Sequence, residues 1–203
     1  MKKILSLSAM LLAALLLITG CAGAAEYSTD DCTETTDTFN PADGNWTCYQ
    51  EGKGISQGKT VDQKMVSKLT ISNNRMTATS ITNEMKFKTV DLLGGQSILD
   101  ALNAYNNLVP GYKEAVYNST CEQLKGGFVN SGYTVNACSM DDNYLTIKLT
   151  YPESALAQNA SIPVIPSTIE IKTNEARTKF TYTANASNSG STYPITYVWI
   201  KED

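Results

Sequence analysis

The chain has 203 residues, with 16 lysines and arginines against 20 acidic residues, a net charge of −4 and no histidine. This acidic balance argues against a nucleic-acid partner and against a broadly basic membrane-binding face. Without histidine the chain lacks the commonest general acid or base at neutral pH. The Ser-His-Asp and Cys-His constellations and most zinc and non-haem iron sites are excluded with it.

The N-terminus has the pattern of an export signal. Two lysines within residues 1–3 precede a Leu/Ala-rich apolar run over residues 4–18. The run is shorter than the roughly 20 apolar residues of a membrane span and has the length of a signal-peptide core. An ordinary secretory signal is one interpretation, because residues 22–24 satisfy an A-x-A cleavage site, and cleavage there would discard Cys21.

The segment that ends at the first cysteine resembles the lipobox of bacterial lipoprotein precursors: Leu17-Ile18-Thr19-Gly20-Cys21. In that family the cysteine thiol is diacylated, and a dedicated peptidase then cuts directly before it. The resemblance implies a lipoprotein signal peptide over residues 1–20, a lipidated Cys21, and an extracytoplasmic chain anchored to the cell membrane or an outer membrane. Two acyl chains on one residue give stable attachment. Cleavage would remove two lysines and no acid, for a net charge of −6.

Four further cysteines follow Cys21, and an even number in an exported chain predicts two disulfides. A four-cysteine zinc site is the alternative, but the sequence has no C-x-x-C pair. Of the three connectivities we predict the sequence-local one, Cys32–Cys48 with Cys121–Cys138. Crossed pairs would require the N-terminal segment to fold back onto the helices.

Residues 21–58 are rich in Thr, Asp and Gly and almost free of aliphatic side chains. This composition predicts a flexible stalk that carries one disulfide-closed loop. Residues 52–60 look at first like a phosphate-binding P-loop. The motif needs glycines five positions apart, whereas Gly52 lies six and Gly54 four positions before Gly58. We therefore interpret this stretch as linker.

Residues 59–203 predict a single α+β domain: a mostly antiparallel sheet built from hairpins, with one or two helices packed on one face. Residues 167–203 are a candidate C-terminal β appendage. Alternating and β-branched residues bounded by turn residues predict the strands, and apolar residues at helical spacing predict the helices. The predicted strands are 61–71, 76–81, 133–140, 144–151, 168–173, 178–183 and 195–201, and the predicted helices are 97–109 and 112–128.

Two details of this pattern bear on packing. In the first helix the apolar stripe is Ile98, Leu102, Tyr105 and Val109. In the strand over residues 133–140 a regular alternation points Cys138 away from Tyr133 and Val135. The Cys121–Cys138 bond therefore needs either a bulge near Asn136 or a strand whose helix-facing set is Thr134, Asn136, Cys138 and Met140.

About residues 65–156, the chain resembles the small YehR-like bacterial lipoproteins in its strand and turn pattern. The resemblance rests on Gly132-Tyr133-Thr134-Val135, Asp141-Asp142-Asn143, residues 145–151 and Ser154-Ala155-Leu156. It implies a hairpin, a helix and a second hairpin behind a lipobox. The family has no well-defined biochemical activity, so the resemblance implies no site. This chain departs from it in its four extra cysteines, longer helical region and C-terminal strands.

No catalytic, cofactor or metal motif stands out. Asp141-Asp142-Asn143 could contribute to a calcium site, but Asx residues are also what hairpin turns prefer, and we interpret them as a turn. Tyr193, Tyr197 and Trp199 share a strand face that we assign to the core. The acids available for a glycosidase pair fall at element ends and helix surfaces: Asp91, Asp100, Glu114, Glu122, Glu153, Glu170 and Glu175.

These observations favour a non-enzymatic binding or structural module of the bacterial envelope, held at a membrane by the lipid on Cys21. Its partner would be an envelope protein or a glycan, and no cofactor is expected. The alternatives are a histidine-free, acid-dependent glycan or peptidoglycan hydrolase and an accessory subunit of an envelope complex. Two facing carboxylates in a cleft would favour the hydrolase, a flat aromatic or amide-rich patch would favour binding, and an exposed apolar edge would favour the complex.

Overall fold

The computed structural model describes residues 27–73, 75–158, 169–188 and 191–202. The chain divides into two compact units, Met1–Asp31 and Cys32–Asp203. All strands and helices discussed below belong to the second unit. The predicted signal peptide, Cys21 and the connector around residue 164 lie outside the described residues.

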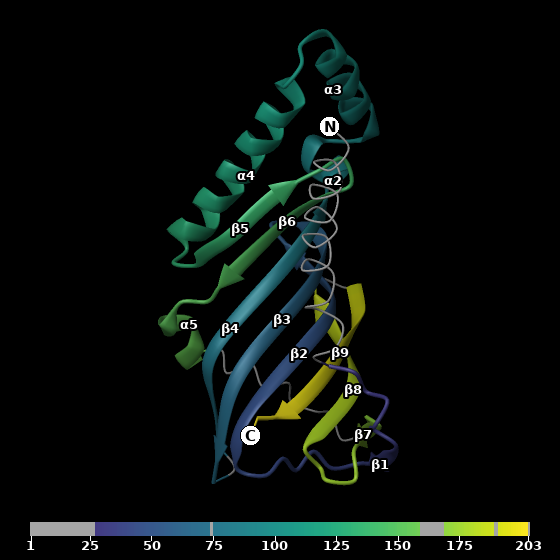
Figure 1. Cartoon of the computed structure of the whole chain (residues 1–203), viewed down its shortest axis with the longest axis vertical. Helices are drawn as coiled ribbons and strands as arrows, with labels where there is room; N and C mark the ends of the chain where they lie inside the picture. Colours follow the sequence, from purple (N-terminus) through teal and green to yellow (C-terminus); the bar gives the residue numbers. More distant parts are fainter. Residues whose placement is uncertain (1–26, 74, 159–168, 189–190, 203) are drawn as a thin grey trace, which may run out of the picture. The chain divides into compact units, whose positions relative to one another are not determined.

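In the described part of the chain, nine strands form one antiparallel sheet in the order β1-β7-β8-β9-β2-β3-β4-β6-β5 (Figure 1). The strands of the candidate appendage, β7 to β9, belong to this same sheet. The strand bounds are β1 Glu34–Thr36, β2 Gly44–Ser56, β3 Lys59–Ser72, β4 Arg75–Lys88, β5 Thr134–Met140, β6 Tyr144–Thr150, β7 Ile171–Thr173, β8 Lys179–Asn188 and β9 Ser191–Lys201.

The two predicted hairpins are confirmed. β3 pairs with β4 from Val61 opposite Phe87 to Ser72 opposite Arg75. β5 pairs with β6 across the Asp141–Asn143 turn. There the Asp141 side chain accepts hydrogen bonds from the backbone N–H groups of Asn143 and Tyr144, at 2.7 and 2.9 Å. An Asx turn of this kind mimics a backbone turn, so the interpretation of these residues as a turn is correct.

The described helices are α2 Thr89–Leu93, α3 Gln96–Leu108, α4 Tyr112–Asn130 and α5 Glu153–Gln158. α3 and α4 are the two predicted helices. They form a helical hairpin beyond the Lys88 end of β4 (Figure 1). α4 then lies along β5, and α5 contacts β4. The fold is therefore α+β and mostly sheet, and the helices do not form one layer on a single face: α4 packs along β5, whereas α5 contacts β4.

The prediction of a flexible stalk over residues 21–58 is wrong from Cys32 onward. β2 lies inside the sheet, between β3 and β9. Its Trp46 and Cys48 are 0% and 1% exposed. Residues 52–60 are not linker but the β2–β3 hairpin, with positive φ at Gln57 and Gly58 as a two-residue type I′ turn requires.

β2 needs few aliphatic side chains because the indole of Trp46 and the thiol of Cys48 occupy its core face, and because the backbone of β9 lies close to Gly52. Gly52 is required where β2 meets β9, because a Cβ there would lie 2.7 Å from the carbonyl oxygen of Pro194. This glycine, one of those that predicted flexibility, therefore permits close strand contact.

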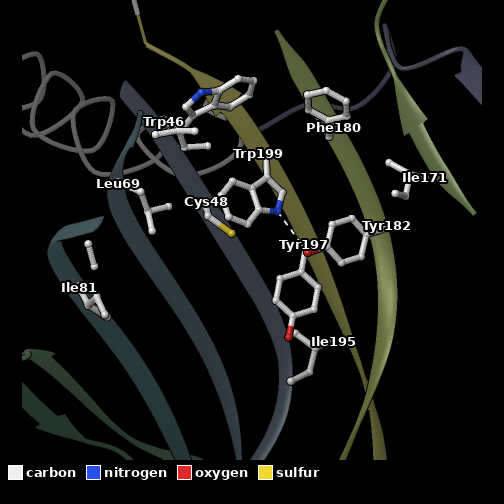
Figure 2. Close-up of a cluster of buried hydrophobic side chains, with 12 residues drawn as sticks. Trp46, Cys48, Leu69, Ile81, Ile171, Phe180, Tyr182, Ile195, Tyr197 and Trp199 are labelled. Atoms are coloured by element: carbon white, nitrogen blue, oxygen red, sulfur yellow. Dashed lines mark hydrogen bonds between the residues drawn. The ribbon is translucent and has the colours of Figure 1, made fainter. Parts of the chain in front are cut away.

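One core cluster contains the aromatic residues of β2, β8 and β9. Trp199 donates a hydrogen bond from Nε1 to the Tyr182 hydroxyl at 3.3 Å, and Tyr182 stacks on Tyr197 with ring centroids 4.9 Å apart (Figure 2). The assignment to the core is correct for Tyr197 and Trp199, whereas Tyr193 is only half-buried. The buried members of the cluster are Trp46, Cys48, Leu69, Ile71, Ala78, Ile81, Ile171, Phe180, Tyr182, Ile195, Tyr197 and Trp199.

A second core cluster joins α4 to the other end of the sheet. Its buried members are Val61, Met85, Phe87, Cys121, Leu124, Leu145, Ile147 and Leu149. Both clusters lie on one face of β3, because Val61, Leu69 and Ile71 are separated by even numbers of residues in a strand whose side chains alternate.

The predicted Cys121–Cys138 disulfide is confirmed, with the two Cα atoms 5.9 Å apart. Of the two strand geometries considered, the bulge is correct. The β5–β6 register shifts between Val135 and Ala137, leaving Asn136 as the extra residue. The bulge turns Cys138 to the same face as Val135, where both pack against the second cluster. The bond therefore staples α4 to β5.

The predicted Cys32–Cys48 disulfide is wrong, since the structure does not join these two residues. Cys48 faces the first cluster, opposite Trp199 in the β2–β9 register. Cys32 precedes β1, and three strands separate β1 from β2 in the sheet. A disulfide requires Cα atoms within about 7 Å. Burial raises the pKa of the Cys48 thiol, which makes it a poor nucleophile.

Candidate functional site

In the described part of the chain, the acids considered for catalysis lie on the surface. All seven acids considered for a glycosidase pair are exposed, as the sequence predicted. Among the described residues no three His, Cys, Asp or Glu side chains gather in a way that could hold a metal ion. Asp141 and Asp142 are engaged in hydrogen bonds of the turn and of α4.

The solvent-facing side of the central strands carries a row of alternating charges. Glu51, Lys64, Glu84 and Lys148 stand side by side in the register of β2, β3, β4 and β6. Glu51 pairs with Lys64 at 3.0 Å and Glu84 with Lys148 at 2.9 Å. Opposite charges on neighbouring strands are typical of a solvated face. This face offers no field of one sign to attract a charged partner.

An open hollow of about 410 Å³ lies at the end of the β3–β4 hairpin. The side chains that line it are all exposed or half-buried, so it offers a ligand no dehydrated polar group. Its lining residues are Thr70, Ser72, Asn73, Arg75 and Thr77.

The strongest candidate is the end of the α3–α4 hairpin. The apolar stripe predicted for the first helix has the right period, but only Leu102 of its four members is buried. Tyr105 and Val109 are exposed at the end of the hairpin, together with Leu108 and Tyr112. Leu108, at 79%, is the most exposed large apolar side chain of the described residues. We define the hairpin tip as Tyr105, Leu108, Val109 and Tyr112.

The hairpin tip carries no charge. The run from Ala101 to Tyr112 contains three asparagines and no Asp, Glu, Lys or Arg. Soluble proteins rarely gather exposed apolar side chains in this way, and where they do the patch usually marks an interaction site. The signal in the sequence is this uncharged stretch over the second half of the first helix and the turn after it, but helical spacing alone predicts an amphipathic face there.

Local contacts join the two helices at the hairpin tip. The rings of Tyr105 and Tyr112 meet edge to face with centroids 4.7 Å apart. The backbone N–H of Lys113 donates to Oδ1 of Asn106 at 3.0 Å, which ties the start of α4 to α3. Gly111 has a φ of +87°, a conformation that favours glycine and reverses the chain between the helices. The apolar side chains are therefore presented on an ordered turn.

A polar network fixes the hairpin to the β5–β6 turn. Lys113 donates to Asp142 at 3.0 Å and to Asn103 at 2.9 Å, and the Tyr117 hydroxyl donates to Asp142 at 3.0 Å. Below this network Leu99, Leu102 and Tyr117 form a small buried cluster. The hairpin is thus supported where it leaves the sheet.

Electrostatics keep this network charged over a wide pH range. The hydrogen bond from Lys113 holds the pKa of the Asp142 carboxyl below its ordinary value. Burial, together with Asp142, raises the pKa of Tyr117 to about 12, so its hydroxyl remains a donor at neutral pH. Because the carboxyl pKa is lowered in the folded state, the ion pair persists in mild acid and is lost only as the pH falls through that lowered value.

No family model, curated protein or solved structure matches the chain. No helix of the described residues is long and apolar enough to cross a membrane. The candidate site therefore stands on its sequence and its geometry.

Proposed function

We propose that the protein is a lipid-anchored, extracytoplasmic module of the bacterial envelope that acts by docking through its hairpin tip and catalyses no reaction. The lipobox that ends at Cys21 supports the anchor. The observation that carries the docking role is the exposed, uncharged and locally ordered hairpin tip. An apolar surface kept in water at the end of a supported hairpin is best explained by a partner that covers it.

The fold supplies what such a role requires. The polar network at Asp142 and the Cys121–Cys138 bond hold the base of the hairpin and the lower part of α4 to the sheet. The tip is therefore already ordered before a partner arrives, which limits the entropy lost on docking. Of the three functions considered from the sequence, this geometry favours the docking module or accessory subunit over the hydrolase.

Lipidation of Cys21 predicts that Cys21→Ser releases the protein from membranes or blocks its processing. The acyl chains provide the attachment, and serine cannot accept them through a thioether. Membrane fractionation after salt and carbonate washes measures this, with the wild-type chain as the control. A Cys21→Ser protein that stays in the washed membranes would show that the lipid is not the anchor.

Docking through the hairpin tip predicts position-dependent cross-linking in intact cells. A photoreactive benzophenone side chain at position 108 should give discrete adducts. The matched control is position 129, because Val129 is also an exposed apolar residue of the hairpin, 56% exposed at the far end of α4. We expect adducts from position 108 and few from position 129. Equal adducts, or none at either position, would contradict the docking role.

A further inference from the structure

The area of the hairpin tip limits what can occupy it. Its four side chains are each about half exposed or more. Taking about 200 Å² for a large side chain, they present roughly 400 Å². A stable interface between folded proteins buries about 800 Å² on each partner. The hairpin tip alone is therefore too small to hold a second copy of the chain, whereas a fluid surface needs no matching shape.

The order of side chains along the hairpin matches the depth profile of a bilayer. The apex carries the aliphatic side chains Leu108 and Val109, and the tyrosines 105 and 112 flank it. The first charges behind them are Lys113, which pairs with Asp142, and the exposed Glu114. Lipid-facing segments place aliphatic groups deepest, tyrosine at the headgroup level and charges in water.

Charge gives a second argument for lipid. The run from Ala101 to Tyr112 is uncharged, so its insertion would carry no charged side chain into the acyl region of a bilayer. For the same reason the run offers no cationic side chain to an anionic headgroup. Recognition of anionic headgroups depends on clusters of Lys and Arg, which the hairpin tip lacks. The tip is therefore suited to the boundary between acyl chains and headgroups, where binding needs no charge.

We infer that the hairpin tip inserts into the surface of a phospholipid bilayer, with Leu108 and Val109 at the acyl boundary and the two tyrosines among the headgroups. This inference rests on the docking role proposed above and names the occupant. β1 lies at the end of the sheet opposite the hairpin (Figure 1). The lipid proposed on Cys21 and the hairpin tip would then both attach the protein to a membrane.

The test uses a tryptophan as a depth probe. The chain from residue 22 onward retains every described element and lacks the lipidated cysteine, so any binding comes from the folded protein. Trp46 and Trp199 are 0% and 1% exposed, so contact with lipid should not change their fluorescence. Leu108→Trp is mixed with neutral phosphatidylcholine vesicles whose acyl chains are brominated. We expect a blue shift and at least twofold quenching of the emission that the new indole adds to the wild-type spectrum, and no change in the corresponding difference for the control Val129→Trp.

Flotation with unlabelled vesicles removes the possibility that the new indole itself creates the affinity. The wild-type chain and Val129→Asp should float, and Leu108→Asp combined with Val109→Asp should reduce the bound fraction at least tenfold. Both positions are exposed, so near-ultraviolet circular dichroism should show unchanged folding.

The outcomes separate this inference from the proposed function. An unquenched probe at position 108 and no flotation of the wild-type chain would overturn the bilayer inference. If position 108 still gave protein adducts in cells, the docking role would stand with a protein occupant. If it gave none, both proposals would fail. Phospholipid adducts at position 108 together with quenching would support both.

Discussion

Replacing Trp46 with alanine is expected to destabilise the folded protein by about 3–5 kcal/mol, the usual range for removing a buried tryptophan side chain. The indole is fully buried, its Nε1 donates to the carbonyl oxygen of Ala42 at 2.9 Å, and its ring lies 5.8 Å from that of Phe180. Alanine leaves a cavity in the first core cluster and an unpaired carbonyl oxygen. Urea unfolding at neutral pH measures the loss of free energy.

The matched control for this prediction is Lys53→Ala, an exposed position on the same strand. A surface substitution of this kind is expected to change stability by less than about 0.5 kcal/mol. Deletion of residues 32–58, which removes β1 and β2, should prevent folding altogether. If Trp46→Ala lowered stability by less than about 1 kcal/mol, β2 would be no integral part of the core.

Removing the Cys121–Cys138 bond is expected to lower stability by about 3 kcal/mol, from the chain entropy of a loop with a sequence separation of 17. The double substitution Cys121→Ala and Cys138→Ala avoids placing a new polar group at the buried position 121. For a protein of this size the thermal midpoint should fall by roughly 6–12 °C. Calorimetry measures it, and hydrogen exchange should show the loss concentrated in α4 and β5.

A reducing agent gives the internal control for the disulfide. Reduction should lower the midpoint of the wild-type protein to near that of the double variant and leave the double variant unchanged. Cys48→Ala should respond to reduction as the wild type does, because Cys48 is not bonded to Cys32. An unchanged wild-type midpoint under reduction would show that the bond contributes nothing to stability.

The sequence predicted those elements whose signal is local. The β3–β4 and β5–β6 hairpins followed from turn residues between alternating strands, and the helical hairpin followed from apolar residues at helical spacing on either side of Pro110-Gly111. The bulge near Asn136 was one of two geometries that could reconcile the Cys121–Cys138 bond with the residue pattern of β5, because regular alternation would point Cys138 away from Val135. In each case the deciding residues lie within a few positions of one another or are joined by a covalent bond.

β2 could not be predicted because its stability comes from distant partners. Trp46 and Cys48 become core residues only when β9 pairs with one side of the strand and β3 with the other. Read alone, the glycines and charges of residues 51–54 describe a linker. The residue pattern of β2 alone does not indicate that this strand pairs with β9 at the other end of the domain.

The hairpin tip was missed for a related reason. The spacing of Tyr105 and Val109 shows that they share a helix face with Leu102, but not how far the sheet extends beneath that helix. The sheet supports the hairpin as far as Tyr117 and Leu102, and the last turn of α3 projects beyond it. Helical period alone identifies an apolar face, whereas burial depends on what covers it.

The position of β2 between β3 and β9 also constrains the order in which the protein folds as it emerges from the ribosome or a translocation channel. Every residue of the second core cluster lies between 61 and 149, so that part can close early. The first cluster includes Trp199, and β9 emerges after every other strand of the sheet. Until then one flank of β2 is an unpaired apolar edge, the feature of a nascent chain most prone to aggregate or to require a chaperone.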